Sequence, residues 1–281
     1  MTDQAVLSVD LEYFRHTPAY RGASGTLSDP EVGRAGVDFL SDAFERRGIE
    51  TTWFVVAEIV ESAPEPVEGL AAAGHEIGSH TRSHRLLSDL DAETRRSELR
   101  ASKSMLERAA GEPVRGFRAP AFDVGPDHFE ALEAAGYAYD SSVVPSRRIP
   151  GWYGGEHERQ RPGPVTAIRQ EAPDGVAELP VSVMPGLRLP LTGTWLRFFG
   201  PQYTILGMRL LARRGITPVL YVHPWELVDL PAVEGVPKRV YYHTGDWMRR
   251  AVTRILATDF EFVTAREALA RSDAVAVADS T

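Results

Sequence analysis

Short apolar runs alternate with longer amphipathic segments along most of this chain. The first run, AVLSVDLE at 5–12, is apolar and turns polar at its end, which predicts a buried strand. In 30–48, Val37, Leu40 and Phe44 recur at helical spacing before a glycine, which predicts a helix ending there. Similar patterns predict strands at 51–58, 76–80, 116–120, 137–144, 176–183, 217–227 and 260–264, and helices ending at Gly74 and spanning 91–111, 126–136, 202–215 and 245–259.

About eight strand–helix alternations follow one another without a clear linker or an internal repeat. Such alternation is typical of parallel strands, which leaves a barrel or an open doubly wound sheet as the candidate folds. No G-x-G-x-x-G follows the first strand, which disfavours a dinucleotide-binding site. The sequence predicts one domain over 1–281, with an irregular insertion at about 145–176 and a frayed tail after about 272.

Composition excludes several kinds of chemistry and partner. The 281 residues contain no cysteine, so disulfides and thiolate metal ligands are both excluded. A net charge of −8 argues against a general nucleic-acid binder, since phosphate contacts need clustered lysines and arginines. Neither a secretory signal nor an apolar run of membrane-spanning length is visible, so we expect no transmembrane segment and a cytoplasmic location.

Unusual polar residues gather at the carboxyl ends of the predicted strands. In barrels and open α/β sheets, this edge is where active sites are built. Each residue alone has an ordinary structural explanation, but their shared location favours a functional site. The set consists of Asp10, Glu12, His80, His84, Arg118, Asp140, Glu178 and His223.

Two pairs in this set suggest a metal site. Asp10 and Glu12 are two residues apart on a strand, so both side chains project to one face. They are either a strand end turning polar or a metal ligand beside a general base. His80 and His84 have the i, i+4 spacing that places two imidazoles on one face of a helical turn. They are either surface histidines or, with one carboxylate, a two-histidine, one-carboxylate metal set; His75 precedes its strand and is expected to be structural.

Arg118 and His223 complete the candidate site. A buried arginine at a strand end needs a carboxylate partner, and Asp10 is the natural one, either as a structural salt bridge or as a functional pair. His223 follows an apolar strand and is fixed by the proline and tryptophan after it. It is either a satisfied core histidine or, beside a metal site, a general acid, with Glu226 orienting it or pairing with an arginine.

In their order along the chain, the segments SVDLE, GHEIGSHTRSH, GFRAPAF, YDSSVVP and YVHPWEL resemble the motifs of the polysaccharide deacetylases. This family includes chitooligosaccharide and peptidoglycan N-acetylglucosamine deacetylases, and the resemblance runs from about residue 5 to 270. It implies a deformed (β/α) barrel of seven or eight strands and a divalent metal ion, with Zn²⁺ as the first expectation.

The resemblance also implies a role for each residue. Asp10 would be the catalytic base, oriented by Arg118, and His223 the general acid. The metal ligands would be Glu12, His80 and His84. The family commonly has adjacent aspartates in its first motif, whereas here the pair is spaced D-x-E.

The expected activity is metal-dependent hydrolysis of the N-acetyl group of an amino sugar in a glycan or glycan precursor. An N-acetylated carbohydrate is therefore the expected partner. One alternative is a metal-dependent hydrolase of another small amide, similar to an allantoinase; another is a non-catalytic glycan-binding protein on the same fold. The residues expected to contact substrate are Tyr13, Phe122, Asp140 and Trp225, with Trp152, Tyr153 and Trp195 as further aromatic candidates.

Overall fold

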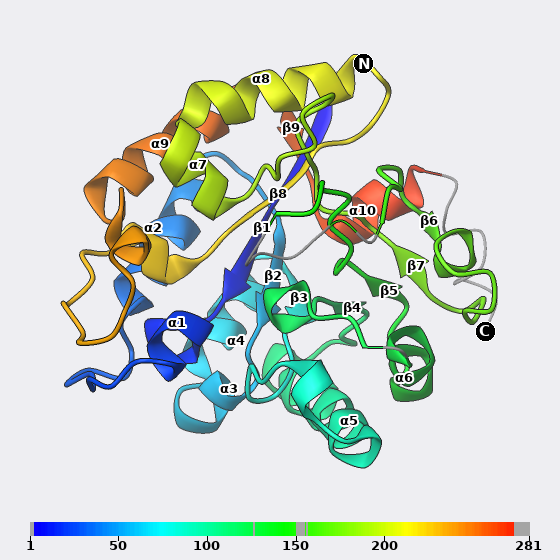
Figure 1. The fold of residues 1–281 in the computed structure, drawn as a ribbon, viewed down its shortest axis with the longest axis horizontal. Coiled ribbons are helices and arrows are strands. Elements are labelled where there is room, and N and C mark those ends of the chain that lie inside the picture. Colours follow the sequence, from blue (N-terminus) through cyan, green and yellow to red (C-terminus); the bar gives the residue numbers. More distant parts are fainter. Residues whose placement is uncertain (1–2, 126, 150–154, 156, 273–281) are drawn as a thin grey trace.

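A curled sheet with helices packed around it forms the centre of the molecule (Figure 1). The computed structural model describes residues 3–125, 127–149, 155 and 157–272. The strands of this part of the chain are β1 Gln4–Leu11, β2 Thr52–Val55, β3 Glu76–Ser79, β4 Gly116–Phe117, β5 Tyr139–Asp140, β6 Gly163–Pro164, β7 Ala177–Glu178, β8 Val219–Val222 and β9 Glu261–Phe262.

The sheet confirms the predicted deformed barrel. Its order is β6-β7-β5-β4-β3-β2-β1-β8, and every pairing in it is parallel except that of β6 with β7. The short β9 pairs with the start of β1, at Gln4 and Ala5. Beyond β7 the chain curls back towards β8, because Val181 N–H donates to the Val143 carbonyl and Ser182 N–H to the Val219 carbonyl.

Helices follow most strands, as the alternation predicts. They are α1 Pro18–Arg21, α2 Arg34–Glu45, α3 Glu58–Ser62, α4 Glu65–Ala72, α5 Ala92–Ala110, α6 His128–Ala135, α7 Gly193–Phe199, α8 Pro201–Ala212, α9 Asp246–Leu256 and α10 Ala265–Ala270. The longest, α5, has the predicted ends: the Asp91 carboxylate accepts the Thr94 N–H at its start, and Gly111 follows its last turn with φ +71°. None of these helices is long and apolar enough to cross a membrane.

The alternation of side chains along β1 separates two cores. Leu7, Val9 and Leu11 pack in the larger core, together with residues of the surrounding helices. Val6, two positions from Ser8, packs inside the curl with residues of β2, β5 and β8. Because successive side chains point to opposite faces, Ser8 and Asp10 continue the inner face towards the carboxyl end of the strand. The interior of the barrel is therefore apolar at one end and polar at the other.

Three predicted strands are much shorter than expected. The ladders of β4, β5 and β7 cover two residues each, and prolines follow at 120, 145 and 180. A proline has no N–H to donate, so it cannot extend a ladder. Residues 145–176 are also less irregular than predicted, because β6 lies there, whereas α7 and α10 were not expected at all. Trp152, Tyr153 and residues 273–281 of the predicted tail lie outside the described residues.

Candidate functional site

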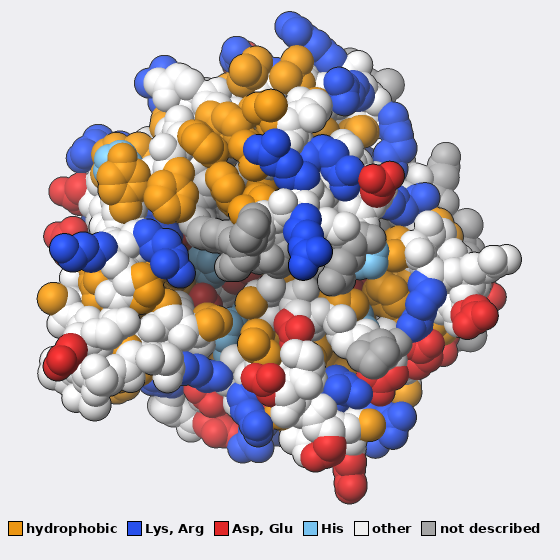
Figure 2. Space-filling model, viewed as in Figure 1, with side chains coloured by type: hydrophobic (Ala, Val, Ile, Leu, Met, Phe, Trp, Pro, Cys, Tyr) orange, Lys and Arg blue, Asp and Glu red, His pale blue; other side chains and the backbone are white. Residues whose placement is uncertain are grey.

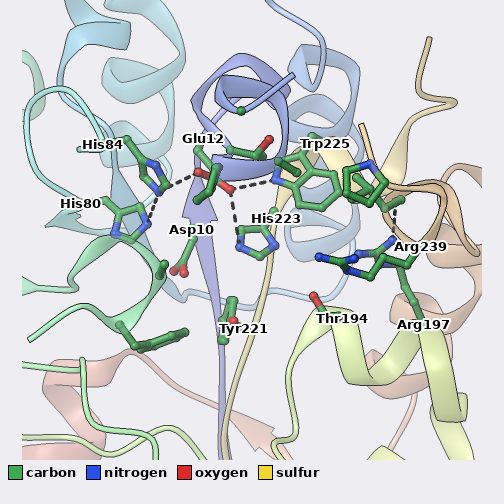
Figure 3. Close-up of a pocket in the computed structure, with 18 of the residues that line it drawn as sticks. Asp10, Glu12, His80, His84, Thr194, Arg197, Tyr221, His223, Trp225 and Arg239 are labelled. Carbon is green, nitrogen blue, oxygen red and sulfur yellow. Dashed lines mark hydrogen bonds and ion pairs between the residues drawn. The ribbon is translucent and has the colours of Figure 1, made fainter. Parts of the chain in front are cut away.

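A cavity of about 640 Å³ opens at the carboxyl ends of the central strands (Figure 3). Asp10 from β1 and Glu12 just beyond it form part of its wall. Other parts of the wall come from α1, from the segments after β3, β4 and β8, and from helix α7. The residues of this wall that bear on the chemistry are Asp10, Glu12, His80, His84, Phe122, Thr194, Arg197, Phe198, Tyr221, His223, Trp225 and Arg239.

Glu12, His80 and His84 point toward one another in this wall (Figure 3). His84 Nε2 lies 2.7 Å from Glu12 Oε2 and 3.2 Å from His80 Nε2. One ligand atom from each residue falls within 4.8 Å of the other two, and all three side chains are buried. Among the described residues, this is the one cluster of three or more such side chains with metal-site spacing.

The hydrogen bonds of the two histidines turn Nε2 of each ring toward the cluster. His80 Nδ1 lies 2.7 Å from the Arg118 carbonyl, and His84 Nδ1 lies 2.9 Å from the His16 carbonyl. A carbonyl oxygen only accepts, so each Nδ1 carries a proton. Burial lowers the pKa of His80 to about 4, so the ring is neutral at pH 7 and its Nε2 lone pair faces His84. A carbonyl on Nδ1 with Nε2 turned inward is the arrangement of metal-bound histidines.

Glu12 completes this set as a buried anion. Burial alone would raise its pKa, but His84, followed by His223 and His80, holds it well below the usual range of a glutamate. Its Oε1 accepts the indole N–H of Trp225 at 2.9 Å, which leaves Oε2 facing His84. A carboxylate oxygen and two imidazole nitrogens with converging lone pairs fit a divalent cation, so these residues suit the expected group.

The loop after β3 brings the two histidines together, but not through the predicted helical turn. Residues 80–86 contain no helix, and Thr81 and His84 have positive φ values of 64° and 55°. His84 N–H donates to the Thr81 hydroxyl, and Glu98 of α5 accepts the N–H groups of Arg82 and Ser83. The two histidines are close, as the i, i+4 spacing predicts, but a tight loop held by α5 brings their rings together instead of a helical turn.

Asp10 is held by the buried Arg118, as predicted. Arg118 NH1 lies 2.6 Å from Asp10 Oδ1 and also donates to the Ser8 hydroxyl at 2.9 Å. Its remaining donors reach the carbonyl and hydroxyl of Ser141, and the guanidinium lies 4.2 Å from the centre of the Phe54 ring. Because every side of the guanidinium has a partner, Arg118 fixes the rotamer of Asp10 within the barrel.

His223 lies on the other side of Asp10 from His80 (Figure 3). Its Nδ1 lies 3.1 Å from Glu226 Oε2, and Glu226 Oε1 accepts from Arg197 Nε at 2.8 Å. Both predicted uses of Glu226 are therefore present at once. Burial alone would lower the pKa of His223, but the carboxylates of Glu226, Glu12 and Asp10 raise it to about 9. A proton on His223 at neutral pH follows from this environment.

Two of the four predicted substrate contacts line the cavity and two do not. Phe122 and Trp225 form part of the wall. Tyr13 does not line the cavity, because its ring is fully buried and stacks on His16. Asp140 does not line the cavity either, and it is fully buried with two hydrogen-bond partners. These are His128 Nε2 at 2.9 Å and the Ser142 hydroxyl at 2.5 Å.

Asp140 and its neighbour Glu178 have a supporting place in the fold. The Ser142 hydroxyl that donates to Asp140 accepts the Ala119 N–H at 2.8 Å, so Asp140 steadies the chain next to Arg118. Burial, followed by the charge of Asp140, raises the pKa of Glu178 well above its usual range, which keeps this carboxyl protonated. The two strand ends therefore position the loop of the site without reaching its cavity.

The sequence reading missed the contribution of α7. Thr194, Arg197 and Phe198 of this helix line the cavity, and Arg197 anchors Glu226. A buried Glu226 needs a cationic partner, which predicts that some arginine lies beside it. The spacing of residues along the sequence does not show which arginine this is. The sequence also does not predict that Arg239 lines the rim of the cavity, because nothing in its sequence neighbourhood distinguishes it from other surface arginines.

Comparison with known families agrees with this geometry. Residues 32–139 match the family model described as polysaccharide deacetylase. Over this segment the chain is similar to the polysaccharide deacetylases. Residues 141–270 match a second model, Domain of unknown function (DUF3473), and the sheet continues across the junction, since β5 pairs with β7. The first match contains His80, His84 and Arg118, and the second contains His223, whereas Asp10 and Glu12 precede both.

Curated relatives carry related names over part of their length. Peptidoglycan deacetylase-like protein FGM2 of Gibberella zeae is 31% identical over 114 residues, which are 40% of this chain and 34% of the relative. Peptidoglycan deacetylase of Helicobacter pylori is 27% identical over 113 residues, which are 40% of this chain and 39% of the relative. The chain thus matches little more than a third of the length of these relatives.

Solved structures share the fold over nearly the whole chain. A Mycobacterium smegmatis protein described as a polysaccharide deacetylase has a TM-score of 0.67 at 22% identity, covering 96% of this chain and 89% of the other. Puue Allantoinase has the same TM-score at 17% identity, covering 98% and 92%. At these identities the likeness concerns the fold, and the chemistry must be argued from the site.

Proposed function

We propose that this protein is a metal-dependent deacetylase that hydrolyses the N-acetyl group of an amino sugar in a glycan or glycan precursor. One observation carries the proposal: three converging metal-ligand atoms lie in one cavity between an arginine-held aspartate and a glutamate-held histidine. Amide hydrolysis needs a polarised carbonyl, a base for the attacking water and an acid for the leaving nitrogen. These side chains provide one group for each need.

The metal would be held by Glu12, His80 and His84. When bound, a divalent ion such as Zn²⁺ supplies polarisation of the acetamide carbonyl and acidification of a water molecule. The spacing D-x-E suits this set, because Glu12 follows β1 and its side chain reaches His84 at 2.7 Å.

Asp10 acts as the base. Arg118 holds Oδ1, so Oδ2 is the oxygen that accepts a proton from the attacking water. The water oxygen then bonds to the acetamide carbon, which becomes tetrahedral. Because Arg118 is fully buried and fully partnered, Asp10 keeps its orientation while it changes charge.

His223 acts as the acid. Its raised pKa supplies a proton at neutral pH, and Glu226 keeps the ring oriented through Nδ1 so that Nε2 faces the cavity. As the tetrahedral centre collapses, the carbon–nitrogen bond breaks and His223 donates its proton to the departing amine. Acetate and a free amino sugar are the products. The rings of Phe122 and Trp225 offer apolar faces in the wall for a sugar.

An acetate-release assay tests the proposal. The metal-loaded protein is incubated with N-acetylglucosamine oligomers and a nucleotide-linked N-acetylglucosamine, with and without a chelator. Allantoin serves as the comparison amide, because an allantoinase shares the fold. We expect acetate from at least one N-acetylated sugar, its loss with chelator and its return when metal is restored. Turnover of allantoin without acetate release from any sugar would contradict the proposal, and so would acetate release that is indifferent to chelator.

A further inference from the structure

Helices α7 and α8 expose an unusual amount of apolar surface beside the cavity. Side chains coloured as hydrophobic gather over this part of the molecule in Figure 2, with arginine and lysine side chains next to them. Phe199 is 49% and Leu206 is 53% exposed. The other large hydrophobic side chains that are exposed in the described residues are Leu187, Phe198 and Tyr242.

These side chains form one surface. The ring of Phe198 stacks on Tyr242 with centroids 5.7 Å apart, and Phe199 contacts Trp195 and Tyr203 at 5.6 and 4.9 Å. The Tyr203 hydroxyl donates to the Leu189 carbonyl, which places the loop bearing Leu187 against α8. We call this surface, with the outer side of α8, the α7–α8 face.

Helix α8 has apolar residues on both sides. Thr204, Gly207, Met208 and Leu211 are buried against the core, whereas Leu206 is exposed on the opposite side. The exposed residues of α8 are Gln202, Leu206 and Arg209, so Leu206 is the one apolar side chain that this helix adds to the exposed surface. Exposed contiguous apolar patches of this kind mark interaction surfaces.

The segment that forms most of the α7–α8 face contains basic but no acidic side chains, and carboxylates from outside it, Glu158 and Glu226, pair with Arg188 and Arg197. Residues 179–225 contain no aspartate or glutamate, although the whole chain carries a net charge of −8. The arginines of this segment are Arg188, Arg197, Arg209, Arg213 and Arg214. Arg209 on α8 and Arg213, which directly follows the helix, are exposed and lie three and seven residues after Leu206. Apolar and aromatic side chains with arginines alongside them match the interface of an anionic bilayer.

The α7–α8 face is continuous with the wall of the cavity. Phe198 belongs to both, and Thr194 and Arg197 of the same helix line the cavity. A surface that rests on α7 and α8 would therefore meet the cavity mouth.

We propose that the α7–α8 face docks on the surface of an anionic phospholipid bilayer and holds the cavity mouth close to it. A second copy of this chain fits the face less well, because a two-fold interface would join two arginine-bearing surfaces whose segment 179–225 offers no carboxylate to pair with them. An acidic membrane surface satisfies both the apolar and the basic parts. The docking is independent of the chemistry in the cavity, so it stands or falls separately from the deacetylase activity.

Vesicle sedimentation tests the docking. The full chain is mixed with vesicles of phosphatidylglycerol and phosphatidylcholine in equal parts, or of phosphatidylcholine alone, at low and high salt. We expect sedimentation with the anionic vesicles that weakens as salt is raised, because exposed charges are screened. The double variant F199S/L206S should reduce partitioning on the order of tenfold or more, since both side chains lose apolar area that the bilayer would bury.

Matched variants separate the face from the overall charge. R209Q/R213Q should reduce anionic partitioning by roughly fivefold per arginine. R96Q/R100Q removes the same charge from exposed positions of α5 and should leave partitioning unchanged. The proposal is overturned if the unaltered protein ignores anionic vesicles, if F199S/L206S still binds them, or if the α5 variant loses as much as the α8 variant. Sedimentation velocity supplies a further test. If the unaltered protein is a dimer that does not bind vesicles, and F199S/L206S is a monomer, the face would be an interface with a second copy and the proposal would be overturned.

Discussion

Strand β3 has a buried histidine near each end, and the two have different tasks. His75 precedes the strand and His80 follows it. Both are almost fully buried, and burial lowers the pKa of each to about 4. A depressed pKa therefore does not distinguish a histidine that holds the fold together from one that can hold a metal.

The hydrogen bonds do distinguish them. His75 Nδ1 accepts the Thr51 N–H at 3.2 Å, so its lone pair is used inside the scaffold, and its ring packs against Phe44 and Trp53. His80 Nδ1 instead donates to a carbonyl, so its lone pair is on Nε2 and faces His84. Opposite tautomers thus follow from opposite partners, and only the tautomer of His80 presents a ligand atom to the cavity.

The largest expected effect is that of His80→Ala. Removing one of three ligands should lower bound metal to background and reduce deacetylation on the order of 10³-fold, because polarisation of the carbonyl and activation of water are lost together. Elemental analysis and acetate release measure the two effects. His75→Gln is the matched control at the other end of β3, and it should retain both metal and activity at neutral pH. Metal loss in both variants would remove the distinction between the two histidines.

His223→Ala should separate chemistry from metal binding. His223 approaches the metal set only through Glu12 Oε1, at 3.7 Å, and contributes no atom to the converging ligands. We expect metal content to remain and kcat to fall by about 10²- to 10⁴-fold, the usual contribution of a general acid. Glu226→Gln is the informative companion, because it keeps the imidazole but removes the first charge that raises its pKa. The alkaline limb of the kcat profile should move to lower pH in that variant, and a variant that loses its metal would show that His223 is a ligand.

His75 should affect the free energy of unfolding rather than catalysis. Its pKa is 6.5 in an unfolded chain and about 4 when folded, so the unfolded state binds the proton more tightly. The contribution of a neutral His75 is therefore present above pH 6.5 and is lost as the pH falls towards 4, at about 3 kcal/mol for the full shift. Urea unfolding of the unaltered protein and of His75→Gln between pH 7 and pH 4 measures this. The unaltered protein should have the steeper loss, and parallel pH profiles would contradict the assignment.

The sequence predicts which polar residues lie at the ends of strands, but it does not predict how their side chains are oriented. The pairing of Asp10 with Arg118 followed from a simple need: a buried guanidinium requires a carboxylate. The histidine pair was found by its spacing, yet its geometry comes from left-handed residues in a loop, which a helical period does not describe. Thr81, His84, Ala121 and Phe122 all have positive φ beside the cavity, and such backbone conformations are stabilised by tertiary contacts rather than by local sequence.

Tyr13 and Asp140, the two predicted substrate contacts that do not line the cavity, show what the position along a strand leaves undetermined. A strand end lies near the active edge, but depth within the barrel decides whether its side chain meets the cavity. Asp140 stops one layer below, where Ser142 connects it to the chain beside Arg118. Arg197 illustrates the converse, because it reaches Glu226 from a helix 29 residues earlier in the chain. The curl of the sheet determines which of these side chains come close together, and the spacing of residues along the sequence does not predict that curl.

The smallest expected effect separates a buried ring from a ring in the cavity wall. Tyr13→Phe should change the KM for an N-acetylated sugar less than about twofold, because Tyr13 is fully buried and does not line the cavity. Phe122→Ala should raise that KM by about fivefold or more, since an apolar face of the wall is removed. Steady-state kinetics with one substrate measures both, and thermal unfolding shows that each variant is folded. A large KM effect from Tyr13→Phe alone would contradict the use of burial to decide which rings meet the sugar.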